Sequence, residues 1–371
     1  MEKNINIGIV GTGSFATFAA QVFLNIEGVS IVAVSDINKV AGNDLAKNLN
    51  TIFYNNYQEL VRSDKVDLVY ISTPPYLHYE ISQYSLRSGK HVICEKPAAL
   101  KTSEAEELQQ IAKENNLLYV VNLMQRYNPL YSTVQKIIDE KLLGNFLHGF
   151  FENYASDEFL DQSHWFWDQS KSGGIFIEHG VHFFDMFNGW LGKGEVVSAL
   201  EIRREAIPTN IFDRVQTSII YKKGVVNFYH GFDQPKILDR QEMRLQFERG
   251  DITLYGWVPI KIKIHGVVSN EVLEIFKIIL DNPSIIYHNG DDQKTNIVKG
   301  KFRDISYHYL VTIESGSNDQ KQERYQQLLG SMLSDQIAWI NNRSHIRKID
   351  DNNAVESLRM AENAKSISQI F

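Results

Sequence analysis

The first third of the chain predicts an α/β fold with a doubly wound parallel sheet. The chain of 371 residues is long enough for two domains. Its beginning reads as an apolar strand, a glycine turn and a helix, and strands and helices then alternate to about residue 123. Such alternation is typical of a parallel sheet covered by helices. We therefore expect a first domain over residues 1–123.

The first strand, at 5–10, runs into the sequence Gly-Thr-Gly-Ser-Phe-Ala at 11–16, and apolar residues come after it at helical spacing to residue 26. This is the G-x-G-x-x-A form of the dinucleotide fingerprint. Gly11 allows a tight turn, Gly13 lets the backbone approach a pyrophosphate, and the small Ala16 lets helix and strand pack closely. A glycine turn of this kind also occurs as a purely structural turn, so its meaning depends on the residues downstream of it.

The second strand, at 29–34, ends just before Asp36. A carboxylate about 20 residues after the glycine turn is the group that binds the ribose hydroxyls of NAD and repels the 2′-phosphate of NADP. Ile37 comes next in place of a basic residue, so NAD is favoured over NADP. The alternative is that Asp36 caps a helix.

The remaining elements of the first domain continue the alternation. We expect strands at 52–54, 66–71, 92–94 and 118–122, and helices at 57–62, 78–88 and 103–115. Ser103 with Glu106 predicts a capping box for the last of these helices. In a parallel sheet the strand ends that carry the ligand all lie on one edge, so the loops after 71 and 94 belong to the candidate site.

Two proline-containing loops come directly after these strands. The first is Ser-Thr-Pro-Pro-Tyr-Leu-His at 72–78, in which His78 could cap a helix, contact a cofactor or be purely structural. The second is Glu95-Lys96-Pro97, which places a carboxylate and an amine at a strand's carboxyl end. Pro97 restricts the backbone of Lys96 and so fixes the direction of the chain there. Taken alone, this tripeptide is equally typical of a surface loop with a solvated ion pair.

Composition narrows the class of protein. A net charge of -7, with no long run of like charge, argues against nucleic-acid and membrane-surface binding. Cys94 is the single cysteine, so an intrachain disulfide is excluded. The start of the chain shows no secretory signal and no apolar run reaches the ~20 residues of a membrane span. We expect a cytoplasmic protein whose partners are a small molecule and other copies of itself.

The order and spacing of these motifs resemble the Gfo/Idh/MocA family, named for glucose-fructose oxidoreductase, inositol dehydrogenase and their relatives. The resemblance rests on the glycine turn, Asp36, the Thr-Pro-Pro-x-x-His loop, the Gly-Lys-His-Val-x-Cys-Glu-Lys-Pro stretch at 89–97 and Arg-Tyr-Asn-Pro at 126–129. It implies a nicotinamide-dependent dehydrogenase with an N-terminal Rossmann domain. The expected cofactor contacts are Gly11, Thr12, Gly13, Ser14, Phe15, Asp36, Thr73, Pro74, His78, Glu95 and Lys96.

The resemblance also implies a second domain over 124–371 with an open, mostly antiparallel sheet, which carries the substrate side and the contacts of a homodimer or homotetramer. Strand-like runs at 146–154, 196–203, 215–221, 225–231, 243–247, 253–258 and 260–264 agree with this expectation. Helices are expected at 130–141, 323–340 and 353–370, and the last could pack back on the first domain. The stretch 267–315 has no clear pattern and is expected to be an insertion.

A second chemical motif lies at Glu178-His179-x-x-His182, with Asp185 further on. If the segment is helical, Glu178 and His182 face the same way, and the carboxylate can orient the imidazole and raise its basicity. The family has Asp at the position of Glu178, and the resemblance implies that Lys96, Glu178 and His182 form the catalytic set. A metal site or a structural helix cap are the alternatives, and no metal is expected because Glu178 and His179 diverge.

The resemblance implies hydride transfer between NAD and a secondary alcohol of a sugar, cyclitol or sugar derivative. His182 would act as the general base and Lys96 would stabilise charge on the same oxygen. Trp165, Arg126 and Asn153 are further substrate candidates, and the bond between Lys96 and Pro97 is expected to be cis. Two alternatives stay open: an NAD-dependent glycosidase that uses transient oxidation, and a regulator that senses dinucleotide and sugar without catalysis.

Overall fold

The computed structural model describes residues 4–157, 160–204, 211–222, 224–288, 294–300, 304–317 and 319–371. These residues form two compact units that interleave along the chain. The first takes in the described residues of Met1–Tyr127, Asp161–Asp185 and Tyr325–Ser366, and the second those of Asn128–Leu160, Met186–Arg324 and Ile367–Phe371. The expectation of functional domains at 1–123 and 124–371 stays a prediction.

The first unit is built on a six-stranded parallel sheet with the strand order β3-β2-β1-β4-β5-β6. This is the order of a doubly wound dinucleotide-binding fold, and it confirms the predicted fold class. The strands are β1 (Ile5–Val10), β2 (Val29–Ser35), β3 (Ile52–Tyr54), β4 (Leu68–Ile71), β5 (His91–Cys94) and β6 (Tyr119–Val121). Strands are added on one side of β1 up to β3 and on its other side from β4 onwards, so the switch point lies at the carboxyl ends of the adjacent, parallel strands β1 and β4.

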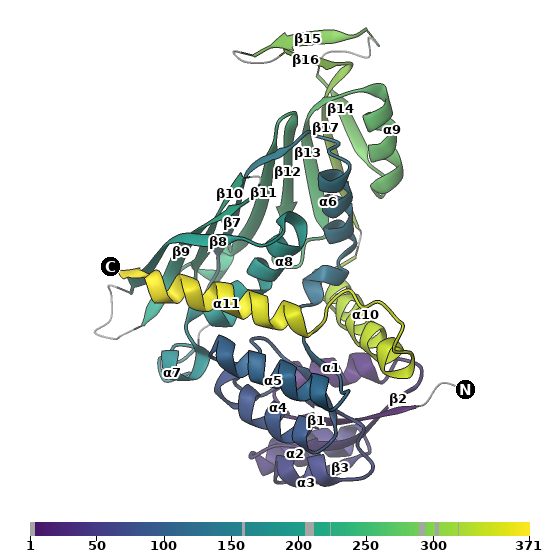
Figure 1. Cartoon of the computed structure of the whole chain (residues 1–371), viewed down its shortest axis with the longest axis vertical. Helices are drawn as coiled ribbons and strands as arrows, with labels where there is room; N and C mark the ends of the chain where they lie inside the picture. The colour runs from purple at the N-terminus through teal and green to yellow at the C-terminus, as the bar shows by residue number, and fades with distance from the viewer. Residues whose placement is uncertain are drawn as a thin grey trace. The chain divides into compact units, whose positions relative to one another are not determined.

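Helices connect these strands and pack on the sheet (Figure 1). They are α1 (Ser14–Phe23), α2 (Lys39–Asn48), α3 (Tyr57–Arg62), η1 (Pro75–Leu77), α4 (His78–Arg87), α5 (Thr102–Glu114) and η2 (Met124–Tyr127). In α1 the buried side chains Ala16, Ala19, Ala20 and Phe23 recur at helical spacing. The helix α2 has no counterpart in the sequence prediction, and Asn38 caps it by accepting hydrogen bonds from the amides of Val40 and Ala41.

The capping box predicted at Ser103 is wrong. Helix α5 begins at Thr102, its N-cap is Lys101, and no side chain of the cap accepts a hydrogen bond. The amide of Thr102 instead donates to the Glu362 carboxylate at 2.9 Å. Glu362 lies on α11 (Asp351–Ile367), so a helix distant in sequence supplies the acceptor that the local sequence was expected to provide.

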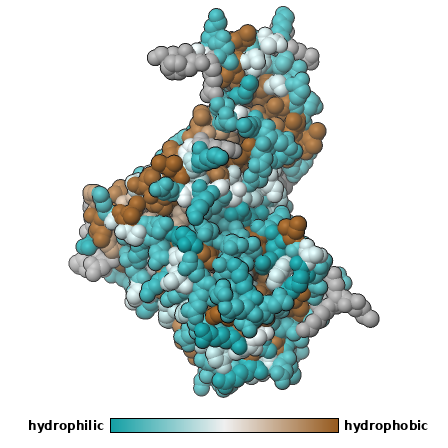
Figure 2. Space-filling view, viewed as in Figure 1, coloured by the Kyte–Doolittle hydropathy of each residue, from teal (hydrophilic) through white to brown (hydrophobic). Residues whose placement is uncertain are grey.

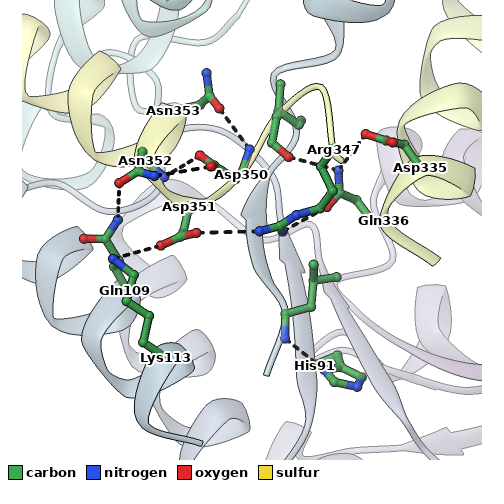
Figure 3. A network of polar contacts seen from close by, with 12 residues as sticks. His91, Gln109, Lys113, Asp335, Gln336, Arg347, Asp350, Asp351, Asn352 and Asn353 are labelled. Carbon is green, nitrogen blue, oxygen red and sulfur yellow. Dashed lines mark hydrogen bonds and ion pairs between the residues drawn. The ribbon is translucent and has the colours of Figure 1, made fainter. Parts of the chain in front are cut away.

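A polar network secures the C-terminal helices within the first unit (Figure 3). Arg347 lies after α10 (Lys321–Asn341); its guanidinium donates to the Gln336 side chain at 3.2 Å and pairs with Asp351 at 3.7 Å. Asp351 also pairs with Lys113 of α5 at 3.5 Å. These contacts join the loop before α11 to the helices on either side of it.

The second unit contains a ten-stranded sheet with the order β14-β17-β13-β12-β11-β7-β10-β9-β8-β18. All neighbouring strands are antiparallel except for the β7–β10 and β8–β18 pairs, which confirms the predicted open, mostly antiparallel sheet. The strands are β7 (Phe146–Tyr154), β8 (Glu195–Arg203), β9 (Phe212–Tyr221), β10 (Gly224–Gly231), β11 (Arg240–Phe247), β12 (Gly250–Tyr255), β13 (Lys261–Val268), β14 (Ser284–Tyr287), β17 (Tyr309–Gly316) and β18 (Gln369–Ile370).

Alternate residues of these strands are buried, so one face of the sheet forms the core of the second unit. Helix α6 (Pro129–Asp139) buries Tyr131, Val134, Ile137 and Ile138, and Tyr131 stacks on Trp190 with ring centres 5.3 Å apart. Trp190 belongs to the last turns of α8 (Val181–Leu191). A short helix, η4 (Lys236–Leu238), lies between β10 and β11.

The described part of the stretch 267–315 contains α9 (Asn270–Ile279), β14, β17 and the hairpin β15 (Asn296–Lys299) with β16 (Asp304–Tyr307). Large apolar side chains are exposed here, and Figure 2 shows hydrophobic residues gathered over this part of the second unit. Ile278 of α9 is 80% exposed and Ile297 of β15 is 64% exposed. A homodimer or homotetramer stays a prediction. Within the described ranges, no helix is long and apolar enough to cross a membrane.

Candidate active site

The glycine turn lies between β1 and α1, as the sequence predicts. Gly11 has φ +94°, and a Cβ there would lie 2.2 Å from the Ser72 carbonyl oxygen, so only glycine fits. A Cβ on Gly13 would meet no atom within 4 Å. Gly13 is also the N-cap of α1 and makes no side-chain capping bond. The turn therefore leaves open space beside the amides that begin a helix, which suits a phosphate group.

Asp36 lies just after β2 and holds the glycine turn in place. One carboxylate oxygen accepts hydrogen bonds from the Thr12 amide at 2.7 Å and the Thr12 hydroxyl at 2.9 Å. The other accepts from the Asn38 amide at 2.7 Å. The next residue is the apolar Ile37, so that position supplies no basic side chain to neutralise the carboxylate. Hydrogen bonds thus join Asp36 to the glycine turn, and they place its negative charge next to the predicted phosphate site.

Thr73 and Pro74 lie in the loop after β4, close to the glycine turn. The position of a Cβ on Gly11 would be 3.2 Å from the Thr73 amide nitrogen. The Thr73 hydroxyl is buried and makes no hydrogen bond within the described residues. A buried hydroxyl without a partner is costly, so this atom is suited to a bound polar ligand. The residues present therefore fit a dinucleotide at this edge of the sheet.

The Glu95-Lys96-Pro97 loop lies directly after β5, and its peptide bond between Lys96 and Pro97 is cis, as expected. The Glu95 carboxylate accepts hydrogen bonds from the Tyr70 hydroxyl and, at 2.8 Å, from the Asn122 amide nitrogen. Burial raises the pKa of Glu95, while these two donors act in the opposite direction. Glu95 is thus tied to the neighbouring strands, and Lys96 is the group that this loop presents.

Lys96 pairs with Glu178, which lies far away in the sequence. Its amine donates to the Glu178 carboxylate and, at 2.8 Å, to the Glu178 carbonyl oxygen. Both residues belong to the first unit. The sequence predicted that Glu178 orients His182, whereas the partner found for its carboxylate is Lys96, a contact that the sequence pattern did not indicate.

The segment that carries Glu178 and His182 is not a uniform α-helix. The short helix α7 (Gln169–Ser172) ends in two glycines with positive φ, a π-helical turn comes next at Phe176–Gly180, and α8 then begins at Val181. Such π-turns are frequent at functional sites because they change the direction of side chains within a helix. The α-helical spacing assumed for Glu178 and His182 therefore does not hold across this turn.

His182 is buried, with 4% of its surface exposed. Burial, and next the positive charge of Lys96, lower the pKa of His182 well below its ordinary value. The imidazole is therefore neutral at neutral pH and able to accept a proton. Lys96, Glu178 and His182, which the sequence grouped, lie together in one unit.

Arg126 and Asp185 form a second buried ion pair in this unit. Arg126 Nε and an NH2 nitrogen donate to the two oxygens of the Asp185 carboxylate at 2.7 and 2.8 Å. The Asn353 side chain donates to the same carboxylate at 2.9 Å. The Arg126 guanidinium, a predicted substrate contact, is thus engaged in a bidentate structural contact, and its role towards substrate stays a prediction.

The other two predicted substrate residues lie in different units. Trp165 belongs to the first unit, where it is partly buried and its ring contacts that of His164 at 5.1 Å. Asn153 belongs to the second unit, is 1% exposed, and donates to the Gly231 carbonyl oxygen at 3.0 Å. Their roles stay predictions as well.

Sequence reasoning missed Tyr325 on α10. Its ring packs against Phe15 of the glycine turn and against Phe18, with ring centres 5.9 and 5.3 Å apart. Burial, and then the charges of Glu95 and Glu178, raise the pKa of Tyr325. Tyr325 therefore lies close to both the turn and the carboxylates. No local motif could have revealed this, because its neighbours lie far from it in sequence.

The geometry defines the class of protein. A doubly wound sheet presents a glycine turn, an acidic residue after β2 and a lysine, a carboxylate and a neutral histidine, all within one unit. These are the parts of a nicotinamide-dependent oxidoreductase. In the described part of the chain, no group of three or more His, Cys, Asp or Glu side chains is placed to hold a metal ion.

Family comparison agrees with this class. Residues 5–123 match the oxidoreductase family with an NAD-binding Rossmann fold, and residues 131–253 match the Gfo/Idh/MocA C-terminal domain. Together these matches cover more than half of the chain. The protein belongs to the Gfo/Idh/MocA family, and it is an NAD(P)-dependent oxidoreductase.

Several known proteins are similar to parts of the chain. Oxidoreductase P35 of Formosa agariphila is 25% identical over 73% of this chain and 85% of its own length. The scyllo-inositol 2-dehydrogenase (NAD(+)) of Bacillus subtilis is 24% identical over 52% of this chain and 55% of its own. The 2,7-anhydro-N-acetylneuraminate hydratase of Escherichia coli is 28% identical over 51% and 50%. The chain thus matches about half the length of the last two proteins.

Among solved structures, levoglucosan dehydrogenase in complex with NADH and L-sorbose superposes with a TM-score of 0.76. The match covers 98% of each chain at 15% sequence identity. At this identity the likeness shows that the fold is shared.

Proposed function

We propose that this protein transfers a hydride between NAD and a secondary alcohol of a sugar, cyclitol or sugar derivative. The observation that carries the proposal is the cluster of Lys96, Glu178 and buried, neutral His182 in the unit that holds the glycine turn. Similarity to an inositol dehydrogenase supports a polyol as the substrate class. Bound NAD would supply the hydride acceptor.

The chain's own residues would hold the cofactor and move the proton. The amides that begin α1 would bind the phosphates, and Asp36 would accept hydrogen bonds from the ribose hydroxyls. His182, kept neutral by burial and by Lys96, would take the proton from the substrate hydroxyl at an imidazole nitrogen. The Lys96 amine would donate a hydrogen bond to the same oxygen and stabilise negative charge on it.

Glu178 would keep Lys96 in position while substrate is absent. Its carboxylate and its carbonyl oxygen both accept from the amine, so the amine is fixed from two directions. Glu178 stands where the family usually has Asp, and it lies within the π-helical turn at Phe176–Gly180. We include Glu178 in the catalytic set for this reason.

The choice of NAD over NADP rests on Asp36. Its carboxylate already holds the Thr12 amide, so a 2′-phosphate would meet a fixed negative charge without a basic neighbour. An Asp36→Ser variant is expected to lose discrimination between the two cofactors, measured by fluorescence titration with NADH and NADPH. Equal binding of both cofactors by the unaltered protein would contradict this part of the proposal.

A panel of sugars and cyclitols, including scyllo-inositol, myo-inositol and levoglucosan, tests the reaction. Each compound is added with NAD, and NADH absorbance is monitored. Steady NADH formation with one of them supports the proposal. Binding of NADH without turnover of any compound would favour a regulator.

A second candidate is a reaction in which NAD is reduced by the substrate and reoxidised within one cycle, as in the glycosidase alternative. The similarity to a 2,7-anhydro-N-acetylneuraminate hydratase favours keeping it, because hydration involves no net redox change. Conversion of an anhydro sugar or a glycoside without NADH accumulation, detected by mass spectrometry, would support this candidate over the first.

A further inference from the structure

His78 links the two loops that the proposed reaction uses. It is the first residue of α4, and 1% of its surface is exposed. Its Nδ1 lies 2.7 Å from the Pro97 carbonyl oxygen, and its Nε2 lies 2.7 Å from the Thr73 carbonyl oxygen. One side chain therefore spans the loop after β4, beside the glycine turn, and the loop after β5, which presents Lys96.

The number of protons on the ring decides how many of these contacts are hydrogen bonds. A carbonyl oxygen only accepts, and a neutral imidazole has one N–H whereas an imidazolium has two. The charged groups that act on the ring are Lys96, which disfavours a second proton, and Glu178, which favours it. Burial has the largest effect and lowers the pKa of His78. The contacts with the Pro97 and Thr73 carbonyl oxygens act against burial and favour the protonated ring, which donates to both loops at once, whereas a neutral ring donates to one loop at a time.

We propose that His78 is a positioning residue that ties the backbone of Thr73 to that of Pro97, and thereby places the cofactor loop and the Lys96 amine relative to each other. The proposal rests on the proposed function for the roles of these two loops. Both ring nitrogens face protein carbonyls, so His78 acts through the loops, whereas the sequence had placed it among the direct cofactor contacts.

Two substitutions separate the two contacts. The side-chain amide nitrogen of Asn lies near the place of Nδ1, and that of Gln near the place of Nε2, so His78→Asn keeps the donor to Pro97 and His78→Gln keeps the donor to Thr73. We expect His78→Asn to bind NADH about tenfold more weakly with Lys96 undisturbed, since one buried hydrogen bond to the cofactor loop is lost. His78→Gln is expected to keep the affinity for NADH and to change the position of the Lys96 amine, because the hydrogen bond to the Pro97 carbonyl is lost.

Two readouts report on the two loops without any substrate. NADH affinity is measured by fluorescence titration. The environment of the Lys96 amine is measured by the chemical shift of its NMR signal after reductive methylation with labelled formaldehyde. A Lys96→Arg variant assigns this signal. Once a substrate is known, His78→Gln should lower kcat about tenfold with little change in the KM for NAD. These readouts remain valid if no alcohol is oxidised, so failure of the proposed function and failure of this inference are distinguishable.

His91→Asn is the matched control. The His91 ring accepts a hydrogen bond from the Leu118 amide at 2.9 Å, at the opposite end of β5, and neither readout should change in this variant. The inference is overturned if His78→Asn and His78→Gln change both readouts equally, or if neither variant changes either readout. Circular dichroism of each variant shows whether it is folded.

Discussion

Two ion pairs lie on the segment from Glu178 to Asp185, and they differ in geometry. Lys96 reaches Glu178 with a single amine, whose side chain is 18% exposed. Two nitrogens of the Arg126 guanidinium donate to the Asp185 carboxylate in a bidentate arrangement, and the Asp185 side chain is 3% exposed. A lysine amine on a flexible chain can exchange one acceptor for another, whereas a bidentate guanidinium cannot without losing both bonds. We therefore propose that the first pair serves the reaction and that the second holds the segment in place.

The largest expected effect is on turnover, and it comes from removing Lys96 of the first pair. Lys96→Ala should lower kcat by about 10²–10⁴, the usual contribution of one acid-base group, while NADH binding is retained. The measurement is steady-state turnover beside an NADH titration. Lys136→Ala is the control, because Lys136 forms an ion pair with Glu140 on the exposed surface of α6. Near-normal turnover in Lys96→Ala would remove lysine from the mechanism.

Removing one partner of the second pair, Arg126 and Asp185, should lower the stability of the fold. Arg126→Ala leaves the Asp185 charge buried without its guanidinium, and the free energy of unfolding should fall by about 3–5 kcal/mol, measured by urea denaturation. Removing the exposed pair between Arg87 and Glu107 by Arg87→Ala should cost less than about 1 kcal/mol. If Arg126→Ala keeps its stability and loses affinity for substrate, the residue belongs to the substrate site.

A smaller effect tests how Glu178 is used. Glu178→Gln removes the charge and keeps the length of the side chain, so the Lys96 amine keeps an acceptor but loses its ionic partner, and kcat should fall about tenfold. Glu178→Asp keeps the charge but shortens the side chain, and should retain more activity than Gln. The two kcat values are compared. A higher kcat in Glu178→Gln than in Glu178→Asp would show that the length of the side chain matters more than its charge.

The smallest effect concerns pH. The pKa of His182 is lowered, so the neutral base persists below pH 6.5, and kcat/KM for alcohol oxidation should fall only when the pH approaches the lowered pKa. Because the charge of Lys96 contributes to the lowering, Lys96→Met should raise the pKa of His182 and move the acidic limb to higher pH. An NMR titration of the His182 ring in both proteins measures this, and a shift in the opposite direction would contradict the arrangement.

Much of the candidate site could be predicted from local sequence. The glycine turn, Asp36 and the Glu95-Lys96-Pro97 loop each sit at the end of a strand, and the position of a strand end is set by residues within a few places of it. The partners of those groups could not be read in this way. Tyr325 beside Phe15, Glu362 at the start of α5 and Asn353 on Asp185 all come from the last fifty residues, where no motif marks them.

The sequence by itself determined the doubly wound sheet and the edge of it that carries the chemistry, because apolar periodicity and glycine positions act over short distances. Only the tertiary structure decided which charges meet. The π-turn at Phe176–Gly180 changes the spacing within the segment, and the pairing of Lys96 with Glu178 joins residues 82 positions apart. Long-range pairs of this kind depend on how the whole chain packs, and hydrogen-bonding partners in a buried site are chosen by that packing.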